Sequence, residues 1–438
     1  MSLVLDARAG RITPEMEKVA AEEKVEVELI LAGLAEGTIV IPGNVNRKVP
    51  KPCGIGKGLR IKVNALIGTS SERDDRQMEL RKIAAAEAAG CDSFMDLSTG
   101  GDIDGMRRLT LAHARVPVGS VPIYQAAIEA IERRGSIVAM TPDDMFEAVE
   151  KQARDGIDFM AIHSALNFDI IERLQACGRV TDIVSRGGAF LTGWMLHNQK
   201  ENPLYEQFDR LLEILLKYDV TLSLGDAIRP GSTADSLDGA QLQGLIVAGE
   251  LVRRAREAGV QVMVEGPGHV PLNHVEATIQ LQKSLCGGAP YFILGTLATD
   301  VAPGYDHITA AIGGALAGAA GADFLCYVTP AEHLGLPTEQ DVREGVIAAR
   351  IAAHAADLAR GNRQAWERDL QMARARVALD PEKQIELAVD PERARSLLGG
   401  AEARYTCAAC GPDCAAQVAA GYFGIGRAAD PASPGDSR

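Results

Sequence analysis

The sequence has few aromatic residues, no block of positive charge and no long hydrophobic run. Phe, Trp and Tyr make up 4% of its 438 residues, so small and branched aliphatic side chains have to build the core. The formal net charge is −14. Without a lysine- or arginine-rich block, such a chain would be repelled by the phosphates of a nucleic acid. We therefore predict that nucleic acid is not its partner.

Neither secretion nor membrane insertion is indicated by the sequence. Residues 1–20 contain no apolar signal core. The most apolar long stretch, Ile308–Ala322, is rich in glycine and alanine, and it is shorter than the about 20 apolar residues that span a bilayer. We interpret it as a tightly packed helix, and we expect a cytoplasmic protein with no membrane partner.

Of the eight cysteines, three lie close together in the pattern Cys407-x-x-Cys410-x-x-x-Cys414. In a large chain with no sign of secretion, such a cluster indicates a metal site rather than disulfide bonds. Three thiolates suit a 4Fe–4S cluster with one iron free of protein ligands, and that iron can bind the amino and carboxylate groups of S-adenosylmethionine. A zinc site completed by a fourth ligand from elsewhere is the alternative.

From residue 60 onward, short apolar runs alternate with amphipathic segments. The runs that we predict to be strands are Arg60–Gly68, Ser93–Ser98, Val116–Pro122, Asp158–Ser164, Asp182–Gly188, Val220–Asp226, Val260–Gly266 and Ala322–Thr329. Continuous apolar strands alternating with helices are typical of a parallel sheet covered by helices. Eight such units predict an α/β fold of the (β/α)8, or TIM barrel, type. An open doubly wound sheet is the rival, but no G-x-G-x-x-G follows the first strand.

Helix caps and hydrophobic stripes predict several helices. Thr13 before Pro14 and Thr141 before Pro142 each combine an N-cap with a first helical proline. Residues 201–218 and 237–258 carry apolar side chains on one face. The chain is thereby divided into an N-terminal appendage (1–59), the barrel (60–337), C-terminal helices (338–378), a segment with the cysteine cluster (379–427) and a disordered tail (428–438), which is rich in Pro, Ser, Gly and Asp.

Each predicted strand carries polar or ionisable residues at or near its C-terminal end. They are Asn64; Asp96, Ser98 and Thr99; Ser120 and Tyr124; His163; Ser185 and Arg186; Asp226 and Arg229; Glu265 and His269; and Thr329, Glu332 and His333. The carboxyl ends of the strands form the active-site face of a barrel, so we expect these side chains to surround one cavity.

Two pairs of these residues indicate particular ligands. Arg186 and Arg229 lie beside glycines, which suits an anion such as phosphate; structural bridges to carboxylates are the alternative. His269 and His333 could bind one metal ion and leave open positions for water or substrate; hydrogen-bonded histidines without a metal are the alternative.

The longer motifs resemble the phosphomethylpyrimidine synthase family of radical S-adenosylmethionine enzymes. They include Met95–Gly100, Val121–Gln125, Val184–Gly188, Val264–His269, Asp300–His307 and Cys326–His333, and the match covers nearly the whole chain. The resemblance implies a (β/α)8 barrel, usually a homodimer, with the 4Fe–4S cluster on a mobile C-terminal segment. It also implies 5-aminoimidazole ribonucleotide as substrate, S-adenosylmethionine as the source of a 5′-deoxyadenosyl radical, and an electron donor such as flavodoxin or ferredoxin.

The resemblance also assigns roles to individual residues. The substrate contacts would be Met95, Tyr124, His163, Ser185, Arg186, Gly187, Asp226, Arg229 and Glu265. His269 and His333 would bind a zinc or iron ion near the substrate, and Cys407, Cys410 and Cys414 would hold the cluster.

A few positions depart from the family's usual sequence. Leu66 and Phe292 stand where the pyrimidine synthases have an asparagine and a tyrosine that contact the substrate. Ala161–Ala165 replaces Thr-Ile-His-x-Gly, Thr296 replaces the proline of Leu-Gly-Pro, and Gly287 replaces the histidine of Cys-His. Each hydrogen bond lost from a polar pocket is worth about 0.5–1.5 kcal/mol.

Unchanged cluster and metal residues beside an altered pocket predict the same substrate and a different product. We expect the family's relative that makes 5-hydroxybenzimidazole, the precursor of a cobamide lower ligand. The alternative is synthesis of the phosphorylated pyrimidine of thiamine. A zinc hydrolase that uses His269 and His333, or a non-catalytic metal-binding barrel, would be a protein of another class.

Overall fold

The computed structural model describes residues 2–398, 415, 418–419 and 422. The chain divides into two compact units, Met1–Asp357 and Leu358–Arg438. Cys407, Cys410, Cys414 and the predicted disordered tail at 428–438 lie outside the described residues, and the predicted domain boundaries stay a prediction.

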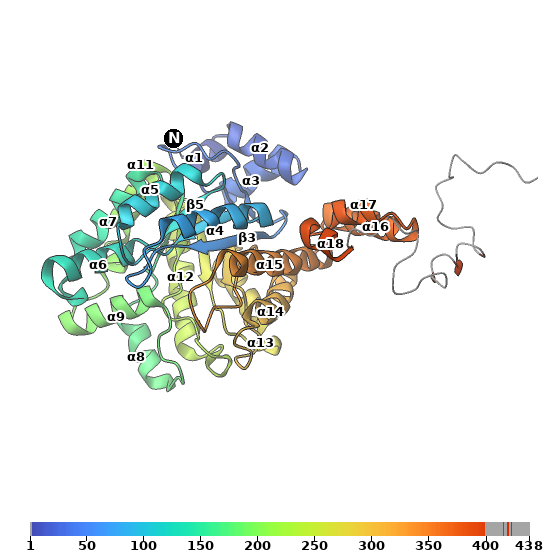
Figure 1. Cartoon of the computed structure of the whole chain (residues 1–438). Coiled ribbons are helices and arrows are strands. Elements are labelled where there is room, and N and C mark those ends of the chain that lie inside the picture. The colour runs from blue at the N-terminus through green and yellow to red at the C-terminus, as the bar shows by residue number, and fades with distance from the viewer. Residues whose placement is uncertain (1, 399–414, 416–417, 420–421, 423–438) are drawn as a thin grey trace, which may run out of the picture. The chain divides into compact units, whose positions relative to one another are not determined.

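The described part of the first unit is built around a closed barrel of eight parallel strands (Figure 1). Around the barrel the order is β10-β3-β4-β5-β6-β7-β8-β9. The strands are β3 (Lys62–Ile67), β4 (Ser93–Asp96), β5 (Val118–Ser120), β6 (Phe159–Ile162), β7 (Thr221–Leu224), β8 (Val262–Gly266), β9 (Tyr291–Leu294) and β10 (Phe324–Cys326). Almost all of their residues are buried, and the predicted (β/α)8 fold is confirmed.

Helices cover the outside of the barrel (Figure 1). They are α4 (Arg76–Ala89), α5 (Ile103–His113), α6 (Pro122–Arg134), α7 (Pro142–Asp155), α8 (Phe168–Cys177), α9 (Arg186–Asn198), α10 (Pro203–Glu206), α11 (Phe208–Tyr218), α12 (Gly239–Glu257), α13 (Leu272–Leu285), α14 (Asp306–Ala320) and α15 (Glu339–Ala359), with the short 3₁₀ turns η1 (Ile137–Ala139) and η2 (Thr233–Asp235). Small residues let α14 approach its neighbours, since a Cβ on Gly318 would lie 2.6 Å from the Cβ of Ala356 in α15.

The two ends of the chain add further elements. The N-terminal segment contains α1 (Leu3–Arg8), α2 (Pro14–Glu23), α3 (Val27–Glu36) and an antiparallel pair, β1 (Ile39–Val40) and β2 (Ile55–Gly56). The second unit contains α16 (Arg363–Val377), α17 (Pro381–Leu387) and α18 (Pro391–Leu398). Among the described helices, none combines the length and the hydropathy that crossing a membrane requires.

One predicted strand is wrong, and one real strand was missed. Asp182–Gly188 contains no strand, because the Ser185 hydroxyl accepts the N–H of Gly188 at 3.2 Å and thereby starts α9 at Arg186. The missing strand of the barrel is β9, Tyr291–Leu294. Both segments are short and contain neighbouring apolar residues, and a strand that is buried on both faces has no alternating pattern to distinguish it.

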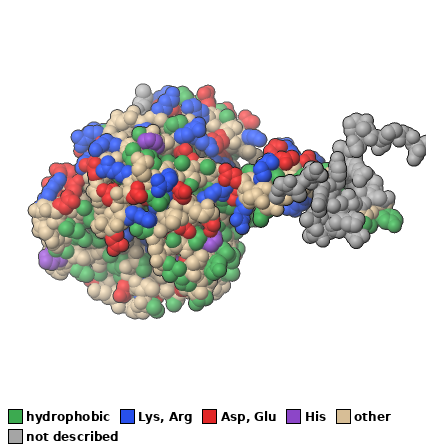
Figure 2. Space-filling view, in the orientation of Figure 1, with side chains coloured by type: hydrophobic (Ala, Val, Ile, Leu, Met, Phe, Trp, Pro, Cys, Tyr) green, Lys and Arg blue, Asp and Glu red, His purple; other side chains and the backbone are tan. Residues whose placement is uncertain are grey.

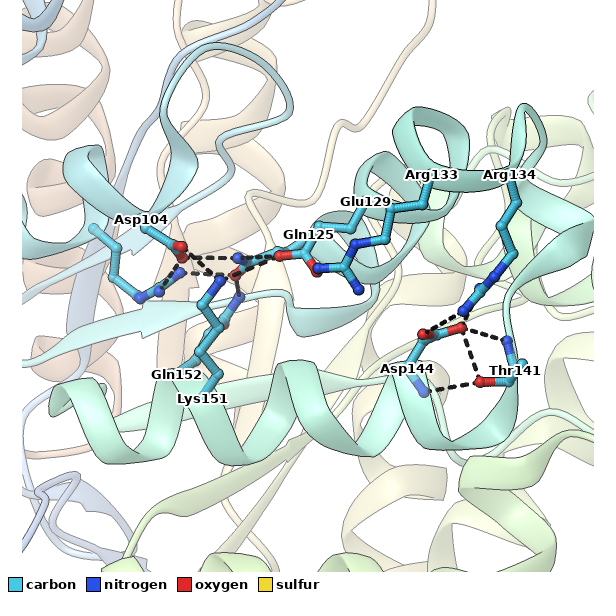
Figure 3. A network of polar contacts seen from close by, with 10 residues as sticks. Asp104, Gln125, Glu129, Arg133, Arg134, Thr141, Asp144, Lys151 and Gln152 are labelled. Atoms are coloured by element: carbon cyan, nitrogen blue, oxygen red, sulfur yellow. Dashed lines mark hydrogen bonds and ion pairs between the residues drawn. The ribbon is translucent and has the colours of Figure 1, made fainter.

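The predicted helix caps are confirmed. Thr13 accepts the N–H of Met16 and starts α2. In the capping box of α7, Thr141 and Asp144 accept from each other's backbone N–H, and Arg134 also pairs with Asp144 (Figure 3). The helix predicted for residues 201–218 is instead two helices, α10 and α11, which meet at Gln207.

Three buried aspartates tie neighbouring strands together at the N-terminal end of the barrel. Asp92, Asp158 and Asp323 each immediately precede a strand. Their carboxylates accept the backbone N–H groups of Val63 (2.9 Å), Val118 (2.8 Å) and Tyr291 (3.1 Å), each in or at the start of the preceding strand of the barrel. Each carboxylate also faces a cation, respectively Arg60, Arg47 and Lys283. These contacts fix the register of the strands at the N-terminal end of the barrel.

Arg47 attaches the N-terminal segment to this layer. Its guanidinium pairs with Asp158 and donates to the carbonyl oxygen of Ala114 at 2.7 Å. The side chain of Asp158 is fully buried. Burial raises the pKa of Asp158 to about 7 even though Arg47 opposes the shift. The ionised form of Asp158 therefore depends on Arg47 as its counter-ion.

Replacing Arg47 by methionine should destabilise the fold. The change leaves a buried carboxylate without its counter-ion, which lowers the free energy of unfolding by about 3–5 kcal/mol. The folded pKa of Asp158 lies above its unfolded value of 3.8, so its ionised form is the costly one and the loss should be smaller at about pH 5 than at about pH 8. Denaturant unfolding at both pH values measures this.

The matched control is Arg210→Met. Arg210 pairs with Asp143 at the surface, where the two side chains are 42% and 72% exposed, and such pairs contribute about 0–1 kcal/mol. Equal losses in the two variants would contradict the role given to Arg47.

Candidate active site

A cavity of about 290 Å³ opens at the C-terminal ends of the strands. Its wall contains six of the predicted substrate-binding residues, namely Met95, Tyr124, His163, Arg186, Arg229 and Glu265. Ser185 and Gly187 lie on either side of Arg186 in the chain, and Asp226 forms backbone hydrogen bonds with Glu265 and Arg229. The tertiary structure therefore brings together side chains that lie far apart in the sequence, from Met95 to Glu265.

The start of α9 contributes positive charge to the cavity. Arg186 is its first residue and Ser185 its N-cap. The Arg186 guanidinium lies over the ring of Tyr124, with 5.2 Å between its central carbon and the ring centroid. Tyr124 in turn contacts Phe190 edge to face. A helix N-terminus with a stacked guanidinium suits an anion such as a phosphate.

Glycines allow α9 to approach the other loops of the site. A Cβ on Gly187 would lie 2.3 Å from Cε1 of His163, and a Cβ on Gly188 would lie 2.2 Å from the carbonyl oxygen of Ala227. Real Cβ contacts are not that short. Only glycine at these two positions lets the helix start pack against both His163 and the loop that carries Arg229.

Asp226, Arg229 and Glu265 form a connected polar group. The Glu265 carboxylate accepts the N–H of Asp226 at 3.1 Å, and the Arg229 guanidinium donates to the carbonyl oxygen of Asp226 at 3.1 Å. Burial raises the pKa of Asp226 to about 6 and also raises that of Glu265, while Arg229 opposes both shifts. The Asp226 carboxyl can therefore keep or release a proton near neutral pH, and burial makes the ionised form of Glu265 less favourable as well.

His163 presents a neutral imidazole to the cavity. The residue is 3% exposed, and within the described part of the chain its Nδ1 atom has no hydrogen-bond partner. Burial, with a contribution from Arg229, lowers the pKa of His163 to about 3. A buried polar atom without a partner is costly, so this nitrogen is suited to hydrogen-bond a ligand.

Figure 3 shows a polar network around Gln125 and Gln152. Gln125, which follows Tyr124 in the first turn of α6, accepts from Gln152 at 2.9 Å and from the buried Arg107 at 2.8 Å. Gln152 in turn accepts the hydroxyl of Ser120, at the end of β5, at 2.6 Å. The network fixes the first turn of α6, which carries Tyr124, to the strand beside the cavity.

His269 and His333 lie side by side, with 5.5 Å between their ring centroids. Nδ1 of His269 is 2.8 Å from a carboxylate oxygen of Asp300, and Nδ1 of His333 is 3.0 Å from one of Asp306. Among the described residues, the hydrogen bonds of these two side chains use Nδ1 and leave both Nε2 atoms available. The described residues contain no group of three or more His, Cys, Asp or Glu side chains that could hold a metal, so an ion here would keep positions open for other ligands.

Three of the departures from the family sequence fall on the cavity. Leu66, Ala161 and Phe292 all line it. Gly287 instead lies between α13 and the start of β9, at the opposite end of the barrel. The prediction that Asn64 lies at the rim is wrong. Asn64 lies in the middle of β3, is fully buried, and forms hydrogen bonds with Ser93 and Cys326.

Several residues of the site were not predicted from the sequence. Phe292 was noted as a departure, but its strand was not identified. Cys326 lines the cavity from the end of β10, and no role was predicted for it. Asp300 and Asp306 lie in a motif that was identified by resemblance, but they received no role. They lie 31 and 27 residues from their histidines, so no local spacing could reveal the pairs.

A family model described as the radical SAM ThiC family matches residues 2–421. The chain belongs to the radical SAM ThiC family. Membership makes it a radical S-adenosylmethionine enzyme and implies a 4Fe–4S cluster together with S-adenosylmethionine. The cluster residues predicted for this ThiC-family chain, Cys407, Cys410 and Cys414, lie outside the described residues.

Several named relatives are similar over nearly the whole length. The 5-hydroxybenzimidazole synthase BzaB of Moorella thermoacetica is 89% identical over 97% of this chain and 100% of its own length. BzaB of Eubacterium limosum is 61% identical over the same shares. The phosphomethylpyrimidine synthase of Moorella thermoacetica is 60% identical over 95% of this chain and 97% of its own length.

The packing of α9 in this ThiC-family chain can be tested with two glycines of that helix. In Gly188→Ala, the added methyl group would meet the Ala227 carbonyl oxygen, and overpacking of this kind lowers the free energy of unfolding by about 1–3 kcal/mol. Gly193→Ala is the control, because nothing lies within 4 Å of its Cβ and alanine in a helix gains about 0.5–1 kcal/mol over glycine. Equal results in chemical denaturation would contradict the tight approach.

Proposed function

We propose that the protein is a 5-hydroxybenzimidazole synthase, which converts 5-aminoimidazole ribonucleotide to 5-hydroxybenzimidazole in the anaerobic synthesis of a cobamide lower ligand. The observation that carries the proposal is the cavity wall, where Leu66, Ala161 and Phe292 replace polar residues of the pyrimidine synthases. The name of the 89% identical relative supports the same product.

The charges of the cavity suit the substrate. Arg186 and Arg229, which both line the cavity, would bind the phosphate of the ribonucleotide, with Ser185 and Gly187 at the start of α9 adding backbone N–H groups. Because His163 is neutral and its Nδ1 atom has no partner among the described residues, it would hydrogen-bond the nucleotide without adding charge.

The remaining residues would hold the sugar and the base. The carboxyls of Asp226 and Glu265 would accept hydrogen bonds from hydroxyl and amino groups of the substrate. Met95 and Tyr124 line the same cavity and would enclose the imidazole. The apolar part of the wall, which includes Leu66 and Phe292, would also keep water away from a radical.

The cofactors would be held by residues with suitable donor atoms. Cys407, Cys410 and Cys414 would hold the 4Fe–4S cluster, which would supply the electron for reductive cleavage of S-adenosylmethionine to a 5′-deoxyadenosyl radical. His269 and His333 would hold a zinc or iron ion through their Nε2 atoms, since both Nδ1 atoms are engaged by carboxylates.

We further propose that the enzyme is a cytoplasmic homodimer that receives its electron from a flavodoxin or ferredoxin. Synthesis of the pyrimidine phosphate of thiamine is the second candidate function. It is favoured by the polar residues at the end of the barrel, which match those implied by the resemblance to the pyrimidine synthases. The two products therefore have to be distinguished directly.

Product analysis tests the proposal. Anaerobic incubation of the reconstituted protein with 5-aminoimidazole ribonucleotide, S-adenosylmethionine and a reductant should give 5-hydroxybenzimidazole and 5′-deoxyadenosine, measured by mass spectrometry. The control Cys410→Ala should give neither, because the cluster loses a ligand. A phosphorylated pyrimidine without any benzimidazole would establish the second candidate instead.

The specificity of the cavity can be tested by restoring the missing polar groups. Leu66→Asn combined with Phe292→Tyr should reduce benzimidazole formation about tenfold or more, because two uncompensated polar groups at about 0.5–1.5 kcal/mol each disturb an apolar wall. The kcat/KM for benzimidazole formation and the proportion of pyrimidine product measure the effect. Leu196→Asn is the control, since Leu196 is 40% exposed on α9. If the double variant kept the wild-type kcat/KM and product ratio, Leu66 and Phe292 would not determine the product.

A further inference from the structure

Both carboxylates that contact the histidine pair come from one loop. Asp300 lies in the loop after β9, and Asp306 begins α14 at the end of that loop. His269 follows β8 and His333 follows β10, the two strands that flank β9 in the barrel. The β9 loop therefore lies between the two histidine-bearing loops and places one carboxylate against each ring.

Asp300 is held by both of its oxygens. Oδ1 lies 2.8 Å from Nδ1 of His269, while Oδ2 accepts the backbone N–H of Thr233 at 2.8 Å and its hydroxyl at 2.9 Å. A carboxylate whose second oxygen is fixed by two donors cannot rotate away from the ring. Thr233 belongs to η2, in the same loop as Arg229, so this carboxylate also joins the loop of the substrate arginine to His269.

Asp306 repeats this arrangement at the second histidine. Oδ1 lies 3.0 Å from Nδ1 of His333, and Oδ2 accepts the N–H of Gly304 at 3.2 Å. The Asp306 side chain is only 5% exposed, so the surrounding structure holds it firmly. In both pairs, Oδ1 of the aspartate contacts Nδ1 of the histidine, and Oδ2 accepts a backbone N–H group.

This geometry fixes the tautomer of each ring in its neutral form. An ionised carboxylate can only accept hydrogen bonds, so each Nδ1 atom has to carry a proton and donate it. In a neutral imidazole the lone pair then resides on Nε2, which is the atom that binds a metal. The ring centroids are 5.5 Å apart, close enough for both rings to face a shared ion.

We propose that Asp300 and Asp306 are positioning residues that hold His269 and His333 in the tautomer and orientation needed to bind one divalent metal ion. The proposal rests on the metal site proposed above, and it adds residues that control affinity without contacting the ion. In such sites, loss of the outer hydrogen-bond partner weakens metal affinity about 10–100-fold.

Asparagine is the informative substitution for both aspartates because it cannot satisfy both neighbours. If its oxygen faces Thr233, its amide N–H donates to Nδ1 of His269 and moves the ring proton to Nε2, which blocks the metal. If its oxygen faces His269, its amide group meets the Thr233 N–H, and two donors oppose each other. Either orientation disturbs the histidine while the side-chain volume stays nearly the same.

The experiment is a calorimetric titration with Zn²⁺ of the full chain, with its iron–sulfur cluster reconstituted so that the cluster cysteines are occupied. Asp300→Asn and Asp306→Asn should each weaken Zn²⁺ binding about 10–100-fold relative to wild type. Thr233→Ala should cause a smaller loss, since the backbone N–H of residue 233 remains. Asp209→Asn is the charge control, because Asp209 is 81% exposed on α11, and it should bind as wild type does.

Two further measurements separate the possible outcomes. The melting temperature of the metal-free Asp300→Asn and Thr233→Ala variants should stay within a few degrees of wild type, which distinguishes loss of positioning from loss of fold. His269→Ala should abolish the same binding event; if it binds Zn²⁺ as wild type does, the metal site itself is wrong and this inference falls with it. If His269→Ala abolishes binding but both asparagine variants retain wild-type affinity, only the positioning role is overturned.

Discussion

The active-site cavity depends on the buried carboxylates at the opposite end of the barrel. Asp92, Asp158 and Asp323 each bond to a backbone N–H at the start of the preceding strand of the barrel. Successive strand residues face opposite sides, so a slip of a strand by one residue would turn its cavity-facing side chains outward. With the register fixed, Leu66 pairs with Met95 and Glu265 pairs with Phe292, and all four line the cavity.

Above this layer, opposite charges are confined in a small buried volume. Arg229 lowers the pKa values of Asp226 and Glu265, while burial raises both and the net shift is upward. Burial and Arg229 act together on His163 and keep its imidazole neutral. The cavity therefore combines fixed positive charge, which suits an anion, with carboxyl and imidazole groups whose charged forms are disfavoured by burial. That balance suits a ligand with a phosphate at one end and weakly polar groups at the other.

The family's chemistry and the choice of product depend on different parts of the chain. Membership in the radical SAM ThiC family follows from motifs along the whole length, whereas the proposed product depends on a few wall positions, among them Leu66, Ala161 and Phe292. Exchanging hydrogen-bonding groups for apolar ones changes which substrate atoms are held, while the phosphate end of the site stays the same. Close relatives of both kinds are consistent with that division, since a pyrimidine synthase still shares 60% of the residues.

The sequence by itself determined the barrel class, the starts of α2 and α7 and the identity of most of the polar residues at the strand ends. Those features are local: Thr13 and Thr141 cap their own helices, and apolar runs alternate with amphipathic ones. Only the tertiary structure decided that β9 rather than Asp182–Gly188 completes the barrel, because a short strand buried on both faces has no periodic signal. It also decided that Asp300 and Asp306 contact His269 and His333, because those contacts arise only when barrel closure brings the loops of β8, β9 and β10 together.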